Sequence, residues 1–181
     1  MYANRMGRLN RTVALVGMMG AGKSSLGRRL AAKLDVPFRD ADAEVEKAAG
    51  CSINEIFERY GEAAFRDCER KVIARLLAER PHVLATGGGA FVDEKNRRCI
   101  KEAALSVWIN VPLDVLVERV TRRDTRPLLR NGNAREILSD LLAARQNIYS
   151  QADVTVMSEN GPPAAGVIRI LEALAERGML D

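Results

Sequence analysis

The sequence GMMGAGKSS at residues 17–25 directly follows the apolar run TVALV. Gly17, Gly22, Lys23 and Ser24 fit the pattern G-x-x-x-x-G-K-[ST], whose glycines let backbone N–H groups point at phosphate oxygens. In this pattern the Lys ammonium reaches the β- and γ-phosphates and the hydroxyl group binds Mg²⁺. A strand-like run lies before the motif and a helical pattern after it, as a phosphate loop requires. We therefore predict a nucleotide-binding site and phosphoryl transfer.

The acid that assists Mg²⁺ is expected after the second apolar run, VPF. The third run, HVLAT, leads into Gly87-Gly88-Gly89 without a carboxylate, whereas Asp40 and Asp42 follow VPF. Two residues apart in an extended chain, these two side chains would point the same way. One could then bind Mg²⁺ through water while the other accepts a proton from a substrate hydroxyl. A helix N-cap is the alternative interpretation of Asp-x-Asp, and both roles can coexist.

Three further features could bind a polar acceptor, and each has a plain structural alternative. The glycines 87–89 leave the backbone open to close approach by a substrate, although a tight turn needs the same residues. Arg66, Arg126 and Arg145 could bind anionic groups, but most arginines lie at protein surfaces. The stretch TRRDTRPLLRNGN at residues 121–133 breaks helical periodicity and is basic, which fits either a mobile loop or a solvated linker.

Composition excludes several classes of protein. The net charge is +4, but the basic residues alternate with acids and aromatic residues make up only 4%, which disfavours a nucleic-acid surface. The three cysteines are dispersed, so neither a disulfide framework nor a zinc site is expected. The single histidine, His82, opens an apolar run and is a poor candidate for a catalytic base. No signal peptide or 18-residue apolar run is present, and we expect a cytoplasmic protein without membrane contact.

Five short apolar runs alternate with helical patterns along the 181 residues. Nearly continuous apolar runs are typical of strands buried on both faces, and their alternation with helices indicates right-handed βαβ crossovers. The predicted fold class is therefore α/β, with a parallel sheet layered by helices. The runs are TVALV at 12–16, VPF at 36–38, HVLAT at 82–86, LSVWI at 105–109 and DVTVM at 153–157.

Taken together, the segments GMMGAGKSSLGRRLA, DAD, FRDCE, TGGGA, TRPLL and ARQNIY resemble the shikimate kinase family in order and spacing. The resemblance spans about residues 12–175. It implies one three-layer α/β/α domain over 1–181, with a five-stranded parallel sheet of the nucleoside-monophosphate-kinase-like P-loop type. It also implies a substrate-binding helical segment at about 41–70 and a lid at about 119–134 that closes over ATP. The N-terminal stretch has no counterpart in the resemblance, and we expect residues 1–11 to be a disordered extension.

The activity implied by the resemblance is transfer of the ATP γ-phosphoryl group to the 3-hydroxyl of shikimate, in aromatic amino-acid biosynthesis. Asp42 would bind the ring hydroxyls and help to remove the proton from the attacking hydroxyl. Arg66 and Arg145 would bind the substrate carboxylate, and the backbone of Gly87, Gly88 and Gly89 would line the same site. The acceptor would be a small molecule, and the chain a monomer.

On the nucleotide side, the resemblance implies that Ser24 binds Mg²⁺ directly and that Asp40 acts on the ion through water. Arg126 would move in with the lid and contact the transferring phosphate, which makes Lys23, Asp42 and Arg126 the catalytic set. Arg119 and the loop near Pro162 and Pro163 would lie close to the adenine. The ATP-binding residues would be Gly20, Ala21, Gly22, Lys23, Ser24, Ser25, Arg119 and Arg126.

Two alternatives stay open at this level. Another small-molecule kinase of the same fold, for gluconate or a nucleoside monophosphate, would keep the phosphate loop, but the Gly-Gly-Gly-Ala segment and the paired arginines argue against it. A non-catalytic nucleotide-binding regulator would have lost a catalytic group, yet Lys23, Ser24, Asp42 and Arg126 are all present.

Overall fold

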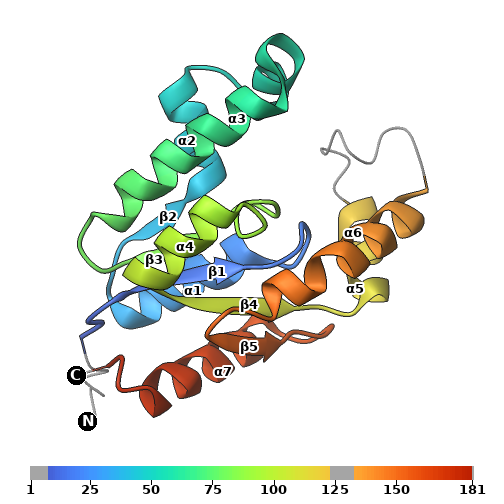
Figure 1. Ribbon diagram of the computed structural model, residues 1–181. Coiled ribbons are helices and arrows are strands. Elements are labelled where there is room, and N and C mark those ends of the chain that lie inside the picture. Colours follow the sequence, from blue (N-terminus) through green and yellow to red (C-terminus); the bar gives the residue numbers. More distant parts are fainter. Residues whose placement is uncertain (1–7, 123–132, 181) are drawn as a thin grey trace.

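The computed structural model describes residues 8–122 and 133–180, and its centre is one five-stranded sheet (Figure 1). All the strand pairs are parallel, and the strand order is β2-β3-β1-β4-β5. The predicted α/β class with a five-stranded parallel sheet is therefore confirmed. The strands are β1 (Thr12–Val16), β2 (Phe38–Asp40), β3 (Val83–Ala85), β4 (Ala104–Asn110) and β5 (Val154–Met157).

The helices cover both faces of the sheet. Right-handed crossovers that run in opposite directions along a sheet place their helices on opposite faces. The connection from β1 to β2 runs in one direction along the sheet and places α1 on one face, where α7 packs beside it. The later connections run in the other direction and place their helices, including the packed pair α3 and α4, on the opposite face. The helices are α1 (Lys23–Leu34), α2 (Ala41–Ala49), α3 (Ile53–Leu77), α4 (Glu94–Ala103), α5 (Leu113–Thr121), α6 (Ala134–Tyr149) and α7 (Pro163–Glu176).

This topology places a ligand crevice at the carboxyl end of β1. The helix that follows β1 leaves toward one face, while those that follow its neighbours β3 and β4 leave toward the other. Ligands of open α/β sheets bind at such a switch point, outside the carboxyl ends of the strands. Both glycine-rich segments, at 17–22 and 87–89, follow strands at this edge.

The second strand lies two residues later than the run VPF predicts. Val36 donates its N–H to the carbonyl of Ala31 and so still belongs to the end of α1. Pro37 has no N–H to give, although its carbonyl accepts from Val83. The paired residues therefore begin with Phe38 opposite Val83, and the strand ends at Asp40.

Helix α3 begins as its sequence predicts and bends at a glycine. Ser52 and Glu55 form the expected capping box at its start. Gly61 has φ 82° and ψ 174°, which interrupts the helix, so a second helical part follows from residue 62. In Figure 1, α2 and the first part of α3 stand away from the sheet, while the second part packs along it.

The chain ends meet beside the sheet. Leu9 is buried and pairs with Leu180 in an isolated antiparallel bridge, and Arg11 donates to the carbonyls of Lys101 and Glu102 at the end of α4. The prediction that residues 1–11 form a disordered extension is therefore wrong for residues 8–11, because Leu9 is buried in the hydrophobic core. Residues 1–7 lie outside the described part of the chain. No helix within 8–122 or 133–180 is long and apolar enough to cross a membrane.

Candidate active site

The phosphate loop at residues 17–22 connects β1 to α1. Gly17 has φ 139°, and a Cβ there would lie 2.8 Å from the carbonyl oxygen of Ile109, so only glycine fits. Lys23 is 8% exposed, and its Nζ donates to the carbonyls of Gly17 and Met18, both at 2.8 Å. Helix α1 starts at Lys23 without a side-chain cap from any described residue, which leaves its first N–H groups suited to an anion.

Asp40 caps a helix and also contacts the phosphate-loop motif through Ser24. It is the N-cap of α2, where its Oδ1 accepts from the N–H of Ala43 at 3.2 Å. Its Oδ2 accepts a hydrogen bond from the hydroxyl of Ser24, with 2.6 Å between the two oxygens. The expectation that Asp40 and Asp42 share an extended segment is wrong, because α2 begins at Ala41, directly after the cap. Asp42 instead lies in the first turn of α2.

Ser24 and Asp40 together fit a magnesium ion. Hydroxyl and carboxylate oxygens are the ligands that Mg²⁺ prefers, and the ion usually keeps several waters beside one or two protein ligands and substrate phosphates. Over the described residues, no group of three or more His, Cys, Asp and Glu side chains could hold a metal. The described residues therefore do not form a magnesium site made of protein ligands alone. Ser24 and Asp40 fit a site in which the phosphates of a nucleotide supply further ligands.

The triple-glycine turn after β3 lies against the phosphate loop and against Asp42. A Cβ on Gly88 would lie 3.1 Å from the backbone nitrogen of Met19. A Cβ on Gly87 would lie 2.7 Å from Oδ1 of Asp42 and 3.4 Å from Oε2 of Glu69. The missing side chains thus let two carboxylates and the phosphate loop approach one short stretch of backbone.

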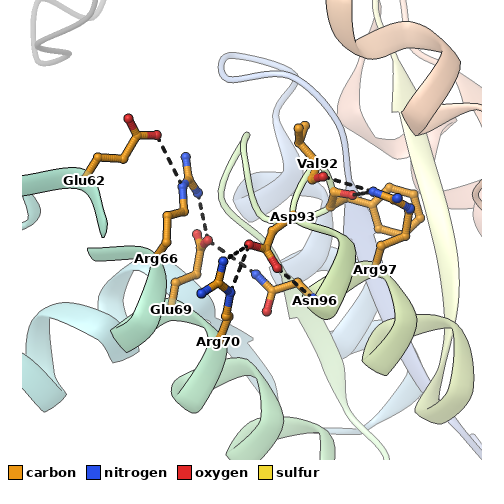
Figure 2. A network of polar contacts seen from close by, with 9 residues as sticks. Glu62, Arg66, Glu69, Arg70, Val92, Asp93, Asn96 and Arg97 are labelled. Carbon is orange, nitrogen blue, oxygen red and sulfur yellow. Dashed lines mark hydrogen bonds and ion pairs between the residues drawn. The ribbon is translucent and has the colours of Figure 1, made fainter. Parts of the chain in front are cut away.

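Arg66 reaches the same turn from the second part of α3. A Cβ on Gly89 would overlap the Arg66 guanidinium, so this side chain lies directly over the glycine. Its Nη1 donates to Oε1 of Glu69 at 2.8 Å, and its Nε lies 3.6 Å from Oε1 of Glu62 (Figure 2). The guanidinium also lies 5.0 Å from the centre of the Phe65 ring. Arg66 therefore has a fixed position beside Gly89.

Glu69 is a buried acid that we did not predict from the sequence. Its side chain is 1% exposed, and burial raises the pKa of its carboxyl, which the neighbouring Arg66 opposes. The amide of Asn96 in α4 also reaches Oε1 of Glu69, at 3.4 Å (Figure 2). The three-residue spacing from Arg66 places both on one helix face and could have suggested the pair.

A second ion pair ties α3 to the start of α4. Arg70 donates through Nε and Nη2 to Oδ2 of Asp93, and Oδ1 of Asp93 caps α4 by accepting from the N–H of Asn96 (Figure 2). The Arg70 guanidinium holds the pKa of Asp93 below its ordinary value. Because Asp93 follows the triple-glycine turn closely, this pair fixes α3 relative to that turn.

Arg145 of α6 is linked to the triple-glycine turn by Tyr149, which lies on the same helix and contacts the turn. The hydroxyl of Tyr149 donates to the carbonyl of Gly88. Burial raises the pKa of Tyr149, while Arg145, through its charge and a side-chain hydrogen bond, and the charge of Arg66 act in the opposite direction. The two arginines, far apart in sequence, therefore both act on one buried phenol beside the turn.

A cavity of about 400 Å³ adjoins the phosphate loop on its other side. Its lining includes Gly20, Ala21, Gly22, Ser25, Arg119 and Pro162. Arg119 donates to the carbonyl of Ala21 at 3.1 Å and to that of Glu159 at 3.3 Å, which joins the phosphate loop to the loop before α7. The predicted adenine neighbours are thus brought together, whereas Arg126 lies outside the described residues.

Comparison with known proteins supplies the family. The family model described as shikimate kinase matches residues 19–175, most of the chain. This chain belongs to the shikimate kinase family. It is 58% identical to the shikimate kinase of Paramagnetospirillum magneticum over 168 residues, covering 93% of this chain and 86% of that protein. It is 54% identical to that of Caulobacter vibrioides strain NA1000 over 166 residues, covering 92% and 83%.

Solved structures of shikimate kinases have the same fold. The shikimate kinase of Acinetobacter baumannii in complex with shikimate superposes with a TM-score of 0.89 at 36% identity, covering 92% of this chain and 94% of that one. That of Aquifex aeolicus gives 0.82 at 36% identity, covering 92% and 98%. A gluconokinase from Sinorhizobium meliloti is only 19% identical, with a TM-score of 0.57 over 94% and 98%, which shows a shared fold alone. Shikimate kinases are phosphotransferases that use ATP and Mg²⁺, and this chain is such an enzyme.

Proposed function

We propose that this chain transfers the γ-phosphoryl group of Mg²⁺-bound ATP to the 3-hydroxyl of shikimate, giving shikimate 3-phosphate and ADP, with the residue roles given below. The observation that carries these roles is the meeting of several elements at the glycines 87–89: Asp42 beside Gly87, the Tyr149 hydroxyl on Gly88 and Arg66 over Gly89. The same turn touches the phosphate loop, so acceptor and donor sides adjoin.

The phosphate loop binds the donor. Its N–H groups and the start of α1 take the phosphates, and Lys23 exchanges its carbonyl partners Gly17 and Met18 for the β- and γ-phosphates. Ser24 would hold Mg²⁺, and Asp40, which caps α2 and accepts from the Ser24 hydroxyl, would act on the ion through water. When bound, Mg²⁺ neutralises developing charge on the phosphates. The base occupies the cavity between Arg119 and Pro162.

Asp42, Arg66 and Arg145 bind the acceptor. A guanidinium offers a planar pair of N–H donors that matches a carboxylate, so the two arginines take the single carboxylate of shikimate. Asp42 accepts hydrogen bonds from the ring hydroxyls and takes the proton from the attacking oxygen. Because phosphoryl transfer depends chiefly on positioning and charge stabilisation, no histidine is needed. Arg126, from the region proposed as a lid, stabilises the transferring phosphate.

Several coarser proposals accompany these roles. The domain comprises a nucleotide-binding core, an acceptor-binding segment at about 41–70 and a lid at about 119–134. The proposed working form is a monomer, and the proposed location is the cytoplasm, where ATP is available. A gluconate kinase has no observation in its favour, because the family model that matches is that of shikimate kinase and the likeness to a gluconokinase extends to the fold alone. A non-catalytic regulator has none either, because the described catalytic groups are present.

The acceptor is tested by measuring ADP release with Mg²⁺-bound ATP. We expect turnover with shikimate and background rates with quinate, gluconate, AMP or no acceptor. Asp42→Asn keeps the size of the side chain but loses the basic oxygen, so kcat should fall by about 10²–10⁴-fold. Near-normal kcat in Asp42→Asn would show that Asp42 is not the base. Equal turnover with gluconate would overturn the choice of acceptor.

A further inference from the structure

Tyr149 is a buried polar residue to which the reaction above gives no role. It is the last residue of α6, its side chain is 0% exposed, and its hydroxyl donates to the carbonyl of Gly88. The same oxygen lies 3.8 Å from the sulfur of Met18 in the phosphate loop. One phenol oxygen therefore lies where the triple-glycine turn, the phosphate loop and α6 meet.

The direction of the hydrogen bonds at this oxygen is fixed by its partners. A carbonyl can only accept, so the Tyr149 hydroxyl donates to Gly88, and its oxygen keeps lone pairs to which a guanidinium such as that of Arg145, which acts on the phenol, can donate. Burial raises the pKa of the phenol, which keeps its proton in place at neutral pH. The phenol thereby links the backbone of the turn to the second proposed carboxylate-binding arginine.

The ring of Tyr149 has little freedom to leave this position. It stacks on Trp108 of β4, with ring centres 6.0 Å apart and planes inclined by 28°. Trp108 belongs to the buried core, where close packing resists displacement of a large side chain. The hydroxyl is therefore a fixed point supplied by the sheet.

The Gly88–Gly89 peptide needs such a fixed point. Glycine adopts conformations closed to other residues, so a peptide between two glycines can rotate between opposite orientations at little cost. A trans peptide is planar, and its N–H points opposite to its C=O. A hydroxyl that holds the Gly88 carbonyl toward α6 therefore directs the Gly89 N–H away from α6.

We propose that Tyr149 is a positioning residue for the acceptor carboxylate, which fixes the Gly88–Gly89 peptide and Arg145 in one geometry. This inference rests on the proposed role of Arg145 in binding shikimate. Tyr149 does not touch the substrate, because its side chain is fully buried. Tyr149 positions the Gly89 N–H and the Arg145 guanidinium, so its loss should weaken the binding of shikimate rather than that of ATP.

Tyr149→Phe tests the proposal because it removes a single oxygen and keeps the ring stacked on Trp108. We expect the KM for shikimate to rise roughly tenfold, as when a buried polar group loses its hydrogen-bond partner, with the KM for ATP within twofold of its original value. The thermal stabilisation given by shikimate should shrink, and that given by Mg²⁺-bound ADP should stay. Asn147→Ala is the matched control, since this exposed residue lies on the opposite side of α6 and should change neither KM.

A double-mutant cycle with Arg145→Ala separates this proposal from the function on which it rests. If Tyr149 acts through Arg145, the two substitutions should raise the KM for shikimate by less than the product of their separate effects. If Arg145→Ala leaves the KM for shikimate unchanged, both the carboxylate role of Arg145 and the inference fail. If Arg145→Ala weakens shikimate and Tyr149→Phe does not, or Tyr149→Phe raises both KM values equally, only the inference is overturned.

Discussion

At the scale of single residues, Arg66 illustrates how a charge is aimed at a ligand. Its Nη1 donates to the buried Glu69, and the planar guanidinium lies over Gly89. A lysine ammonium carries three N–H donors around one compact charge, but it lacks the rigid planar fork that gives a carboxylate two parallel hydrogen bonds while another nitrogen stays on Glu69. The geometry thus requires arginine rather than any cation.

Arg66→Lys should weaken the binding of shikimate far more than that of ATP. Loss of a charge-assisted hydrogen bond is worth about 1.5–3 kcal/mol, which corresponds to roughly a ten- to hundredfold rise in the Kd of shikimate. Calorimetric titration with each ligand measures the effect. Arg75→Lys is the control, because its partner Glu44 lies on α2 and its side chain is exposed. If both ligands weaken equally, Arg66 has a structural role instead.

The residues of this site differ in how well their roles could be predicted from the sequence. Arg66 and Arg145 could be selected only by resemblance, since a guanidinium in a helix is ordinarily at the surface. Glu69 was missed because an Arg-x-x-Glu spacing is typical of solvated helix faces, and burial of the pair depends on α4 packing over it. Tyr149 was missed because an apolar helix position gives no sign that its hydroxyl has a partner 61 residues away.

At the scale of elements, the start of α2 serves helix stability and metal binding through one side chain. Asp40 caps α2 with one carboxylate oxygen and binds Ser24 with the other. Asn is as good an N-cap as Asp, but its amide carries no charge to act on Mg²⁺. Two substitutions can therefore separate the roles.

Asp40→Asn should keep thermal stability but require a much higher Mg²⁺ concentration for half-maximal activity. Asp40→Ala should show the same Mg²⁺ requirement and also lose about 1 kcal/mol of unfolding free energy with the cap, a fall in Tm of roughly 2–4 °C. Thermal melts and a Mg²⁺ titration of the rate measure the two effects. A normal Mg²⁺ requirement in both variants would remove Asp40 from the metal site.

Element boundaries were harder to predict than element types. The apolar runs placed all five strands, because a strand buried on both faces has few polar residues. The second strand was displaced because VPF includes Val36, which closes α1, and ends before the polar Arg39 and Asp40, which still pair with β3. Polar residues at an edge strand carry little sign of their pairing. The extended arrangement expected for Asp40 and Asp42 failed because α2 begins at Ala41, between the two residues.

At the scale of the whole molecule, the sheet has a functional end and a structural end. His82 lies at the structural end, at the start of β3, with a side chain that is 0% exposed. Its Nδ1 lies 2.9 Å from the carbonyl of Arg80, and its buried Nε2 has no hydrogen-bond partner among the described residues. Burial lowers the pKa of His82 below its ordinary value of 6.5.

Stability should therefore fall as the pH drops below about 6.5. The unfolded chain takes up a proton at His82 there, whereas the folded protein does not until its own lower pKa is reached, so the folded state loses up to about 1.4 kcal/mol per pH unit. Urea unfolding at pH 7.5, 6.5 and 5.5 measures this slope. His82→Asn keeps a donor for the Arg80 carbonyl and should flatten the slope. An unchanged slope would assign the pH dependence to other groups.

The pairing of Leu9 with Leu180 brings the described ends of the chain together where the strands begin, whereas the glycine-rich segments follow the strand ends (Figure 1). A bead, a carrier protein or a biosensor surface coupled near Leu9 or Leu180 is therefore attached on the side away from the proposed nucleotide and acceptor sites. An enzyme tethered in this way faces the solution with its nucleotide and acceptor sides, so the chain is suited to immobilised use without rearrangement of its termini.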